Sequence, residues 1–118
     1  MDISITQFGD GATRVVLVGK LDILGAEKVG LPLSTVAGAG GNVVVDMRGV
    51  DFLASIGIRQ LLIAATTIER RSGKLVLLDP TPLVTEVLLT TGVDDILPIV
   101  RSDDEARAAF AGAASGVA

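Results

Sequence analysis

The stretch that decides the fold runs from residue 43 to residue 70 and reads VVVDMRGVDFLASIGIRQLLIAATTIER. Its first part is a nearly continuous apolar run, which is typical of a strand covered on both faces and therefore of a parallel sheet. In its second part, apolar residues recur three and four positions apart, as on one face of an α-helix. These residues are Ile58, Leu61, Leu62, Ala65 and Ile68. A buried strand followed directly by an amphipathic helix predicts helices packed on a parallel sheet.

Further strands are predicted on both sides of this stretch. Residues 3–6 alternate apolar and polar side chains, residues 14–18 are rich in β-branched ones, and Gly9-Asp10-Gly11 offers a turn between them. This order predicts an opening hairpin. Residues 74–78, a lysine followed by four apolar residues, are expected to form another strand. A short last strand is expected over residues 96–100, at an edge of the sheet, because it contains a proline that has no N–H to donate to a ladder.

Helix-start signals precede the remaining helices. Thr81 is a favourable N-cap before a proline at the first helical position, and Gly92 ends the helix that follows. Ser102 is followed three residues later by Glu105, which is the capping-box pattern. Residues 24–37 also show helical spacing, although an internal glycine and an internal proline weaken a helix there.

The order of these elements predicts an α/β fold of one domain. We expect a mixed β-sheet, in which an opening hairpin is followed by parallel strands, with helices packed against it through right-handed crossovers. A chain of 118 residues buries roughly two-thirds of its unfolded surface and needs no disulfide or metal to fold. We place the domain at residues 1–112 and expect residues 113–118, which are small, to form a flexible C-terminal tail.

The composition excludes several classes of function. The chain has no histidine and no cysteine, so it offers no imidazole base, no thiolate nucleophile and no nitrogen or sulfur ligand for zinc. We therefore expect no enzymatic activity, no cofactor and no metal site. A net charge of −4 and only three aromatic residues make a nucleic acid a poor partner. Because no apolar stretch approaches 18 residues, we expect a cytoplasmic protein that does not insert directly into a membrane.

Residues 103–105, Asp-Asp-Glu, form the densest acidic group. Carboxylate clusters bind Mg²⁺ or Ca²⁺ in some proteins. Here the acids fall in the first turn of a predicted helix, where they complement the helix dipole and complete the cap. We therefore interpret them as a structural helix start.

Ser55 is the strongest candidate for a functional residue. It lies between the carboxyl end of a predicted strand and the strongest predicted helix, which is where ligands usually meet an open α/β sheet. One interpretation is an N-cap worth about 1 kcal/mol. The other is a phosphoryl acceptor, whose phosphate the positive end of the helix would stabilise. No neighbouring base activates the hydroxyl, so another protein would have to deliver the phosphate.

The same helix carries a second candidate feature on a face turned away from its apolar stripe. Ile56, Arg59, Gln60 and Ile63 fall on this face, at helical spacing. Exposed isoleucines beside an arginine are typical of a protein-docking surface. The alternative is that loops of the chain itself partly cover this face.

Three motifs stand out together: Gly19-Lys20-Leu21-Asp22, residues 43–47, and Val50-Asp51-Phe52-Leu53-Ala54-Ser55-Ile56-Gly57-Ile58. They resemble the STAS domain of bacterial anti-sigma-factor antagonists, and the resemblance extends from about Ile3 to Phe110. It implies partner switching, in which the unphosphorylated antagonist binds an anti-sigma factor that is a serine protein kinase, and phosphorylation breaks the complex. It also implies that Ser55 is phosphorylated, that Gly57 is the motif glycine and that Asp22 lies near the site.

The motifs depart from the family pattern at three positions. Ala54 stands where the family usually has aspartate, Ile56 where it has serine or threonine, and Lys20 where it has glutamate. These changes reduce the negative charge around Ser55. They leave open a second hypothesis, in which the domain is a cytosolic accessory subunit of a membrane transporter and acts without phosphorylation.

Overall fold

The computed structural model of the chain describes residues 1–115. Within these residues, five strands form one sheet in the order β1-β2-β3-β4-β5. The β1–β2 pair is antiparallel and the other three pairs are parallel, so the predicted hairpin and mixed sheet are confirmed. The strands are β1 (Asp2–Phe8), β2 (Ala12–Leu21), β3 (Val43–Leu53), β4 (Leu75–Leu78) and β5 (Ile99–Val100).

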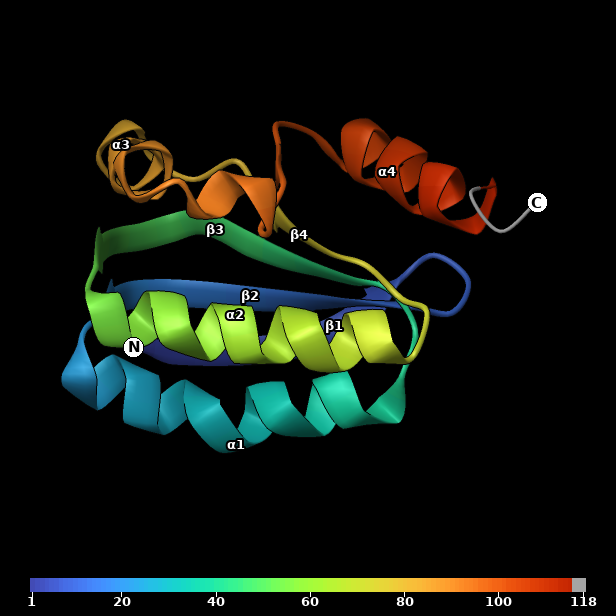
Figure 1. The fold of residues 1–118 in the computed structure, drawn as a ribbon. Coiled ribbons are helices and arrows are strands. Elements are labelled where there is room, and N and C mark those ends of the chain that lie inside the picture. The colour runs from blue at the N-terminus through green and yellow to red at the C-terminus, as the bar shows by residue number, and fades with distance from the viewer. Residues whose placement is uncertain (116–118) are drawn as a thin grey trace.

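Four α-helices and one short 3₁₀ turn, η1 (Val93–Asp95), connect and follow the strands in the described part of the chain. Two helices lie side by side along the sheet, and the other two lie beyond β3 and β4 (Figure 1). The helices are α1 (Ile23–Ala39), α2 (Ser55–Arg70), α3 (Pro82–Thr91) and α4 (Asp103–Ser115).

Two buried clusters hold these layers together. The larger joins the sheet to α1, α2 and α3, and it includes Leu17, Met47 and Leu61. The smaller lies on the other face of the sheet and joins it to α4 through Val44 and Phe110, among others. Because neighbouring residues of a strand point to opposite faces, β3 contributes to both clusters. This explains the nearly continuous apolar run that begins it.

The helix predicted over residues 24–37 is confirmed and is slightly longer, despite an internal proline. Pro32 lies inside α1, and the helix continues through it to Ala39. Val29 and Leu33, on either side of the proline, are both buried in the larger cluster. Packing of an apolar face supplies most of the stability of a helix in a folded protein, so it outweighs the local penalty at the proline.

The C-terminal part differs from the prediction in two places. The last strand covers only Ile99–Val100, at the sheet edge, because Ile96 and Leu97 donate backbone hydrogen bonds to Val93 and continue the η1 turn. α4 extends to Ser115, three residues into the segment predicted as a flexible tail. Residues 116–118 of that segment lie outside the described residues, and the domain boundary at residue 112 stays a prediction. None of the helices in the described part is long and apolar enough to span a bilayer.

Candidate functional site

The site lies where two neighbouring parallel strands end and helices begin. β2 ends at Leu21 and leads into α1, while β3 ends at Leu53 and leads into α2. The two connections are tied to each other, since the Ala54 N–H donates to the Leu21 carbonyl oxygen at 3.0 Å. Ligands of open α/β sheets usually bind at this carboxyl end.

Ser55 is the first residue of α2, and its side chain is exposed. Of the two interpretations of Ser55, the helix cap is wrong, because Ala54 is the N-cap and has the extended backbone of that position (φ −92°, ψ 164°). The bond from Ala54 to Leu21 accompanies this extended conformation, and Ser55 is already helical. Within the described residues, no hydrogen bond engages the Ser55 hydroxyl, so it faces solvent at the amide-rich start of a helix.

Gly57 allows the first turn of α2 to press against the end of β2. A Cβ added to Gly57 would lie 2.6 Å from Leu21 Cγ and 2.8 Å from the Leu21 carbonyl oxygen. No larger residue fits there without moving the helix away from the strand. Gly57 therefore sets how closely Ser55 approaches the β2–α1 connection.

Asp22 belongs to that connection, directly after Leu21. Its Oδ1 accepts a hydrogen bond from the Gly25 N–H at 2.9 Å, so Asp22 caps α1. Lys20, which stands where the family has glutamate, lies on the other side of Leu21. Its Nζ is 3.8 Å from Asp51 Oδ1 and 6.0 Å from the centre of the Phe52 ring. The structure thus brings two of the three motifs, residues 19–22 and residues 50–58, to one edge of the sheet.

The predicted docking face of α2 is exposed in part. Arg59 is exposed and Ile63 is 52% exposed, whereas Ile56 and Gln60 are half-buried. Gln60 and Ile63 border a narrow crevice against α1, so this neighbouring helix covers part of the face.

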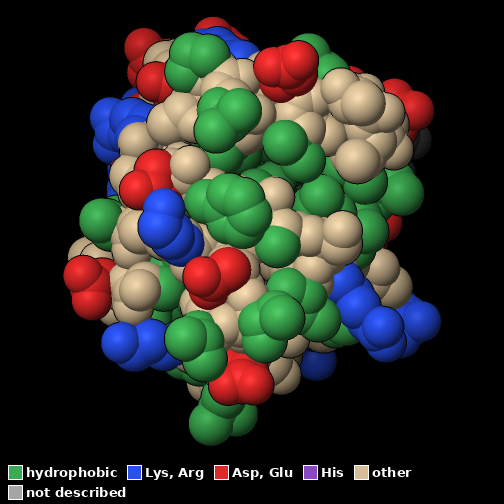
Figure 2. All heavy atoms as spheres, turned by 90° about the vertical axis from the view of Figure 1, so that its left-hand side faces the viewer, with side chains coloured by type: hydrophobic (Ala, Val, Ile, Leu, Met, Phe, Trp, Pro, Cys, Tyr) green, Lys and Arg blue, Asp and Glu red, His purple; other side chains and the backbone are tan. Residues whose placement is uncertain are grey.

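Exposed apolar side chains surround this end of the molecule, and the sequence reasoning missed them. They lie at the end of β3 or in the first turns of α1 and α3, which follow the strands at this edge of the sheet. These residues are Ile23 (67% exposed), Leu24 (74%), Phe52 (44%) and Leu83 (59%). Figure 2 looks onto this end and shows hydrophobic side chains spread between charged ones. The signal in the sequence was the pair Ile23-Leu24 directly after the Asp22 cap. Together with exposed Ser55, these side chains form a surface suited to binding a protein.

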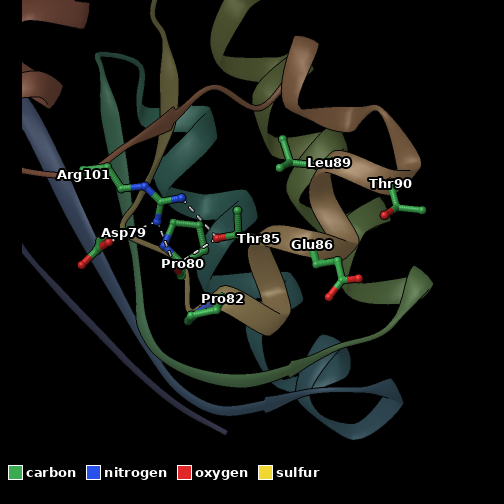
Figure 3. A pocket seen from close by; sticks show the side chains of 8 residues that line it. All are labelled: Asp79, Pro80, Pro82, Thr85, Glu86, Leu89, Thr90 and Arg101. Carbon is green, nitrogen blue, oxygen red and sulfur yellow. Dashed lines mark hydrogen bonds and ion pairs between the residues drawn. The ribbon is translucent and has the colours of Figure 1, made fainter.

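A second concavity, of about 680 Å³, lies between α3 and the segment that precedes α4 (Figure 3). The Arg101 guanidinium borders it on one side and donates to the Pro80 carbonyl oxygen at 3.0 Å and to Asp79 Oδ1 at 3.2 Å. Its other terminal nitrogen is 3.4 Å from the Thr85 hydroxyl. These contacts join the end of β4 to the first turn of α3, which gives Arg101 a structural role.

The acidic group at residues 103–105 has partners in the fold. Arg14 reaches Asp103 at 2.8 Å, and Arg107 reaches Asp104 at 2.9 Å. The Glu105 N–H donates to Ser102 Oγ, so the predicted cap is confirmed, but the Glu105 carboxylate accepts from the Arg101 N–H instead of from Ser102. In residues 1–111, no three acidic side chains are grouped so that they could hold a metal ion.

Asp46 is the buried charged residue of the described core. Burial alone would raise the pKa of its carboxyl, but hydrogen bonds from the Arg48 side chain and backbone, with the charges of Arg48 and Arg14, lower the pKa below its usual value. The Arg48 guanidinium donates to both carboxylate oxygens, at 3.0 Å and 2.7 Å. Asp46 therefore remains an anion inside the fold.

Comparisons with known proteins agree with this geometry. A family model described as "Mlab, STAS domain" matches residues 5–100. The protein BtrV of Bordetella bronchiseptica, which bears the name of an anti-sigma factor antagonist, is 32% identical over 102 residues, or 86% of this chain and 88% of BtrV.

Several solved proteins share the fold, among them two anti-sigma factor antagonists. An anti-sigma factor antagonist from Mycobacterium paratuberculosis has a TM-score of 0.82 at 22% identity, over 92% of each chain. Unphosphorylated SpoIIAA, also an anti-sigma factor antagonist, has a TM-score of 0.77 at 22% identity, over 94% of this chain and 97% of its own. SpoIIAA of Bacillus in the phosphorylated form has a TM-score of 0.68 at 20% identity, over 88% of this chain and 96% of its own.

Proposed function

Because the chain belongs to the STAS-domain family of anti-sigma-factor antagonists, we propose that it acts by partner switching in the cytoplasm. In the unphosphorylated form it binds an anti-sigma factor, which is a serine protein kinase, and so frees the sigma factor. Phosphorylation of Ser55 by that kinase causes the antagonist and the anti-sigma factor to dissociate. The observation that carries the proposal is the exposed, unbonded Ser55 hydroxyl at the first turn of α2, beside exposed apolar side chains.

The physical basis of the switch is the cost of burying a charge. A phosphoserine carries about −1.5 to −2 charges at neutral pH. On the free protein, water and the positive end of α2 stabilise that charge. In a complex that covers Phe52 and Leu24, the phosphate would lose its water, and a buried charge without a partner is strongly unfavourable. Phosphorylation therefore favours the dissociated state.

The protein itself is the acceptor in this reaction and not the catalyst. The neighbouring carboxylate, Asp22, already accepts a hydrogen bond as the cap of α1. Nothing in the motif residues around Ser55 acts as a base toward its hydroxyl, so the partner kinase must supply the base and bind the ATP, whose γ-phosphoryl group passes to the Ser55 oxygen as ADP leaves.

The test is phosphorylation by the cognate kinase with ATP, followed by mass spectrometry of peptides. We expect one added phosphate, located on Ser55. The Ser55→Ala variant should accept none, whereas Ser34→Ala, which removes an exposed serine of α1, should still be phosphorylated. A chain that binds the kinase but stays unmodified would disprove the switch and leave the docking role.

A transporter accessory subunit that works without phosphorylation remains the second candidate. Ala54 and Ile56, which depart from the family's phosphorylation motif, favour it. Ala54 also leaves the first turn of α2 without a side-chain cap. Co-purification with a transporter permease or ATPase, unchanged by Ser55→Ala, would support this function over the first.

A further inference from the structure

The side of α2 that faces away from the core carries a row of residues from its first turn to its last. At 100° per residue, one side of the helix presents six residues over its whole length. We call them the α2 stripe: Ile56, Arg59, Ile63, Thr66, Thr67 and Arg70. Arg59, Ile63, Thr66 and Arg70 are exposed. Most of the stripe, together with Leu62, lines a shallow pocket of about 320 Å³.

The arginines of this helix differ from the others in the described chain. Arg14, Arg48, Arg101 and Arg107 each form an ion pair with an aspartate. Within residues 1–111, Arg59, Arg70 and Arg71 form none, and all three lie on α2 or at its C-cap. Among the described residues of a chain with a net charge of −4, the arginines without an ion pair thus lie together on α2 and at its C-cap.

The helix dipole explains an arginine at only one end of the α2 stripe. Arg70 lies in the last turn, where a cation interacts favourably with the helix dipole. Arg59 lies in the second turn from the start, where the dipole gives a cation no advantage. An anionic group outside this chain would account for both.

The middle of the stripe is apolar. Ile63 is about half exposed, and Leu62 borders it. The Thr66 and Thr67 hydroxyls donate to the backbone carbonyls of Leu62 and Ile63, at 3.0 Å and 3.1 Å. Their hydrogen-bonding capacity is partly used within the helix, so the surface between the two arginines offers methyl groups.

We propose that the α2 stripe docks an acidic amphipathic helix of a partner protein. An apolar side chain of that helix enters the pocket beside Ile63, and carboxylates on either side pair with Arg59 and Arg70. These arginines are eleven residues apart, so about 16 Å of helix separates their Cα atoms. Two carboxylates about three turns apart on a partner helix match that distance. This inference deepens the proposed function, on which it rests for the identity of the partner.

The test uses the full chain, labelled with ¹⁵N, and a designed helical peptide of 15 residues. The peptide carries glutamates at positions 2 and 13 and leucines between them on the same face. We expect amide shifts along residues 55–71, and an affinity that falls when salt is raised from about 0.05 to 0.3 M. A second peptide, with glutamine at positions 2 and 13, should bind about tenfold more weakly.

The variant Arg59→Glu/Arg70→Glu should lose at least about tenfold in affinity for the glutamate peptide. Lys28→Glu/Arg107→Glu changes the net charge equally on α1 and α4 and should bind it normally. Thermal unfolding confirms that both variants are folded. Absence of shifts along α2, equal binding of the two peptides, or binding to phosphatidylglycerol vesicles in place of the peptide would overturn the inference.

This experiment is independent of the phosphorylation test. Ser55→Ala should bind the glutamate peptide as the unmodified chain does, because Ser55 lies at the edge of the stripe and supplies no charge. Failure of Ser55 phosphorylation would therefore leave the peptide result standing, and failure of peptide binding would leave the Ser55 switch standing.

Discussion

At the scale of single residues, the Ser55 side chain is exposed and does not stabilise the fold through a hydrogen bond or a helix cap in the described chain. Its hydroxyl makes no hydrogen bond in the described chain, and its neighbour Ala54 holds the cap position. Neither a capping role nor another contact in the described chain accounts for a serine at this position. The structure therefore leaves Ser55 free for a regulatory role.

Substitutions at Ser55 should show whether a negative charge at this position, and not the loss of the hydroxyl, weakens binding to the anti-sigma factor. We expect Ser55→Asp to weaken binding to the anti-sigma factor by about tenfold or more, because docking would bury an unpaired carboxylate. Ser55→Ala should bind as the unmodified chain does, and it should also unfold at the same temperature, since no cap is lost. Calorimetric titration and thermal unfolding measure the two effects. Equal binding by both variants would place the docking surface elsewhere.

At the scale of elements, the start of α2 is the weakly capped point of the site. The N-cap Ala54 accepts backbone hydrogen bonds from Gly57 and Ile58 through its carbonyl, but its side chain supplies no acceptor for the first turn. Its extended backbone already has the conformation that a capping aspartate adopts. The first turn of α2 therefore lacks a side-chain acceptor only because residue 54 is alanine.

We expect Ala54→Asp to stabilise the protein by about 1 kcal/mol, because the carboxylate would accept from first-turn N–H groups and complement the helix dipole. Chemical denaturation measures this change. Ala108→Asp, which adds the same charge at an exposed position inside α4, serves as the control and should give no gain. If Ala54→Asp were no more stable than the parent chain, the start of α2 would not have this geometry in solution.

At the scale of the whole molecule, one charge network joins segments far apart in the sequence. Arg14 of β2 contacts Asp103 of α4 at 2.8 Å and lies 3.8 Å from Asp46 of β3. Beside it, Arg14 and Arg107 lie over the Phe8 ring, which contacts Phe110 edge to face. The network thus holds α4 on the face of the sheet opposite α1 and α2.

This network predicts how stability depends on pH. The pKa of Asp46 is lowered from its usual 3.8, so its contribution is fully present above that value and is lost as pH falls through the lower, folded pKa. Asp46→Asn should lose about 1–3 kcal/mol at pH 7, because it removes the negative charge beside Arg48 and replaces one of the two acceptor oxygens with an NH2 group that cannot accept. It should also show a smaller loss of stability than the parent chain when the pH falls below about 4. Denaturation at several pH values measures both effects.

Asp104→Asn is the matched control, since it changes an almost fully exposed carboxylate on α4. Ion pairs at such positions contribute little to stability. Its unfolding profile should follow that of the parent chain at every pH. Identical profiles for Asp46→Asn and the parent would mean that the buried pair does not stabilise the fold.

The sequence by itself determined the local structure of this protein. The alternation of strands and helices, the opening hairpin and the caps at Thr81 and Ser102 all follow from the spacing of apolar residues and from side chains within four positions of one another. The prediction that Ser55 lies between the carboxyl end of a strand and the start of a helix also agrees with the structure, in which β3 ends at Leu53 and α2 begins at Ser55.

Only the tertiary structure decided which groups meet across that edge. The bond from Ala54 to Leu21 accompanies the cap at Ala54 instead of at Ser55, and α1 half-covers Gln60. The apolar side chains of Ile23 and Phe52 come to the same surface from the start of α1 and the end of β3. These contacts join residues some 30 positions apart, and periodicity carries no information about partners at that distance. Packing of the sheet against its helices selects them.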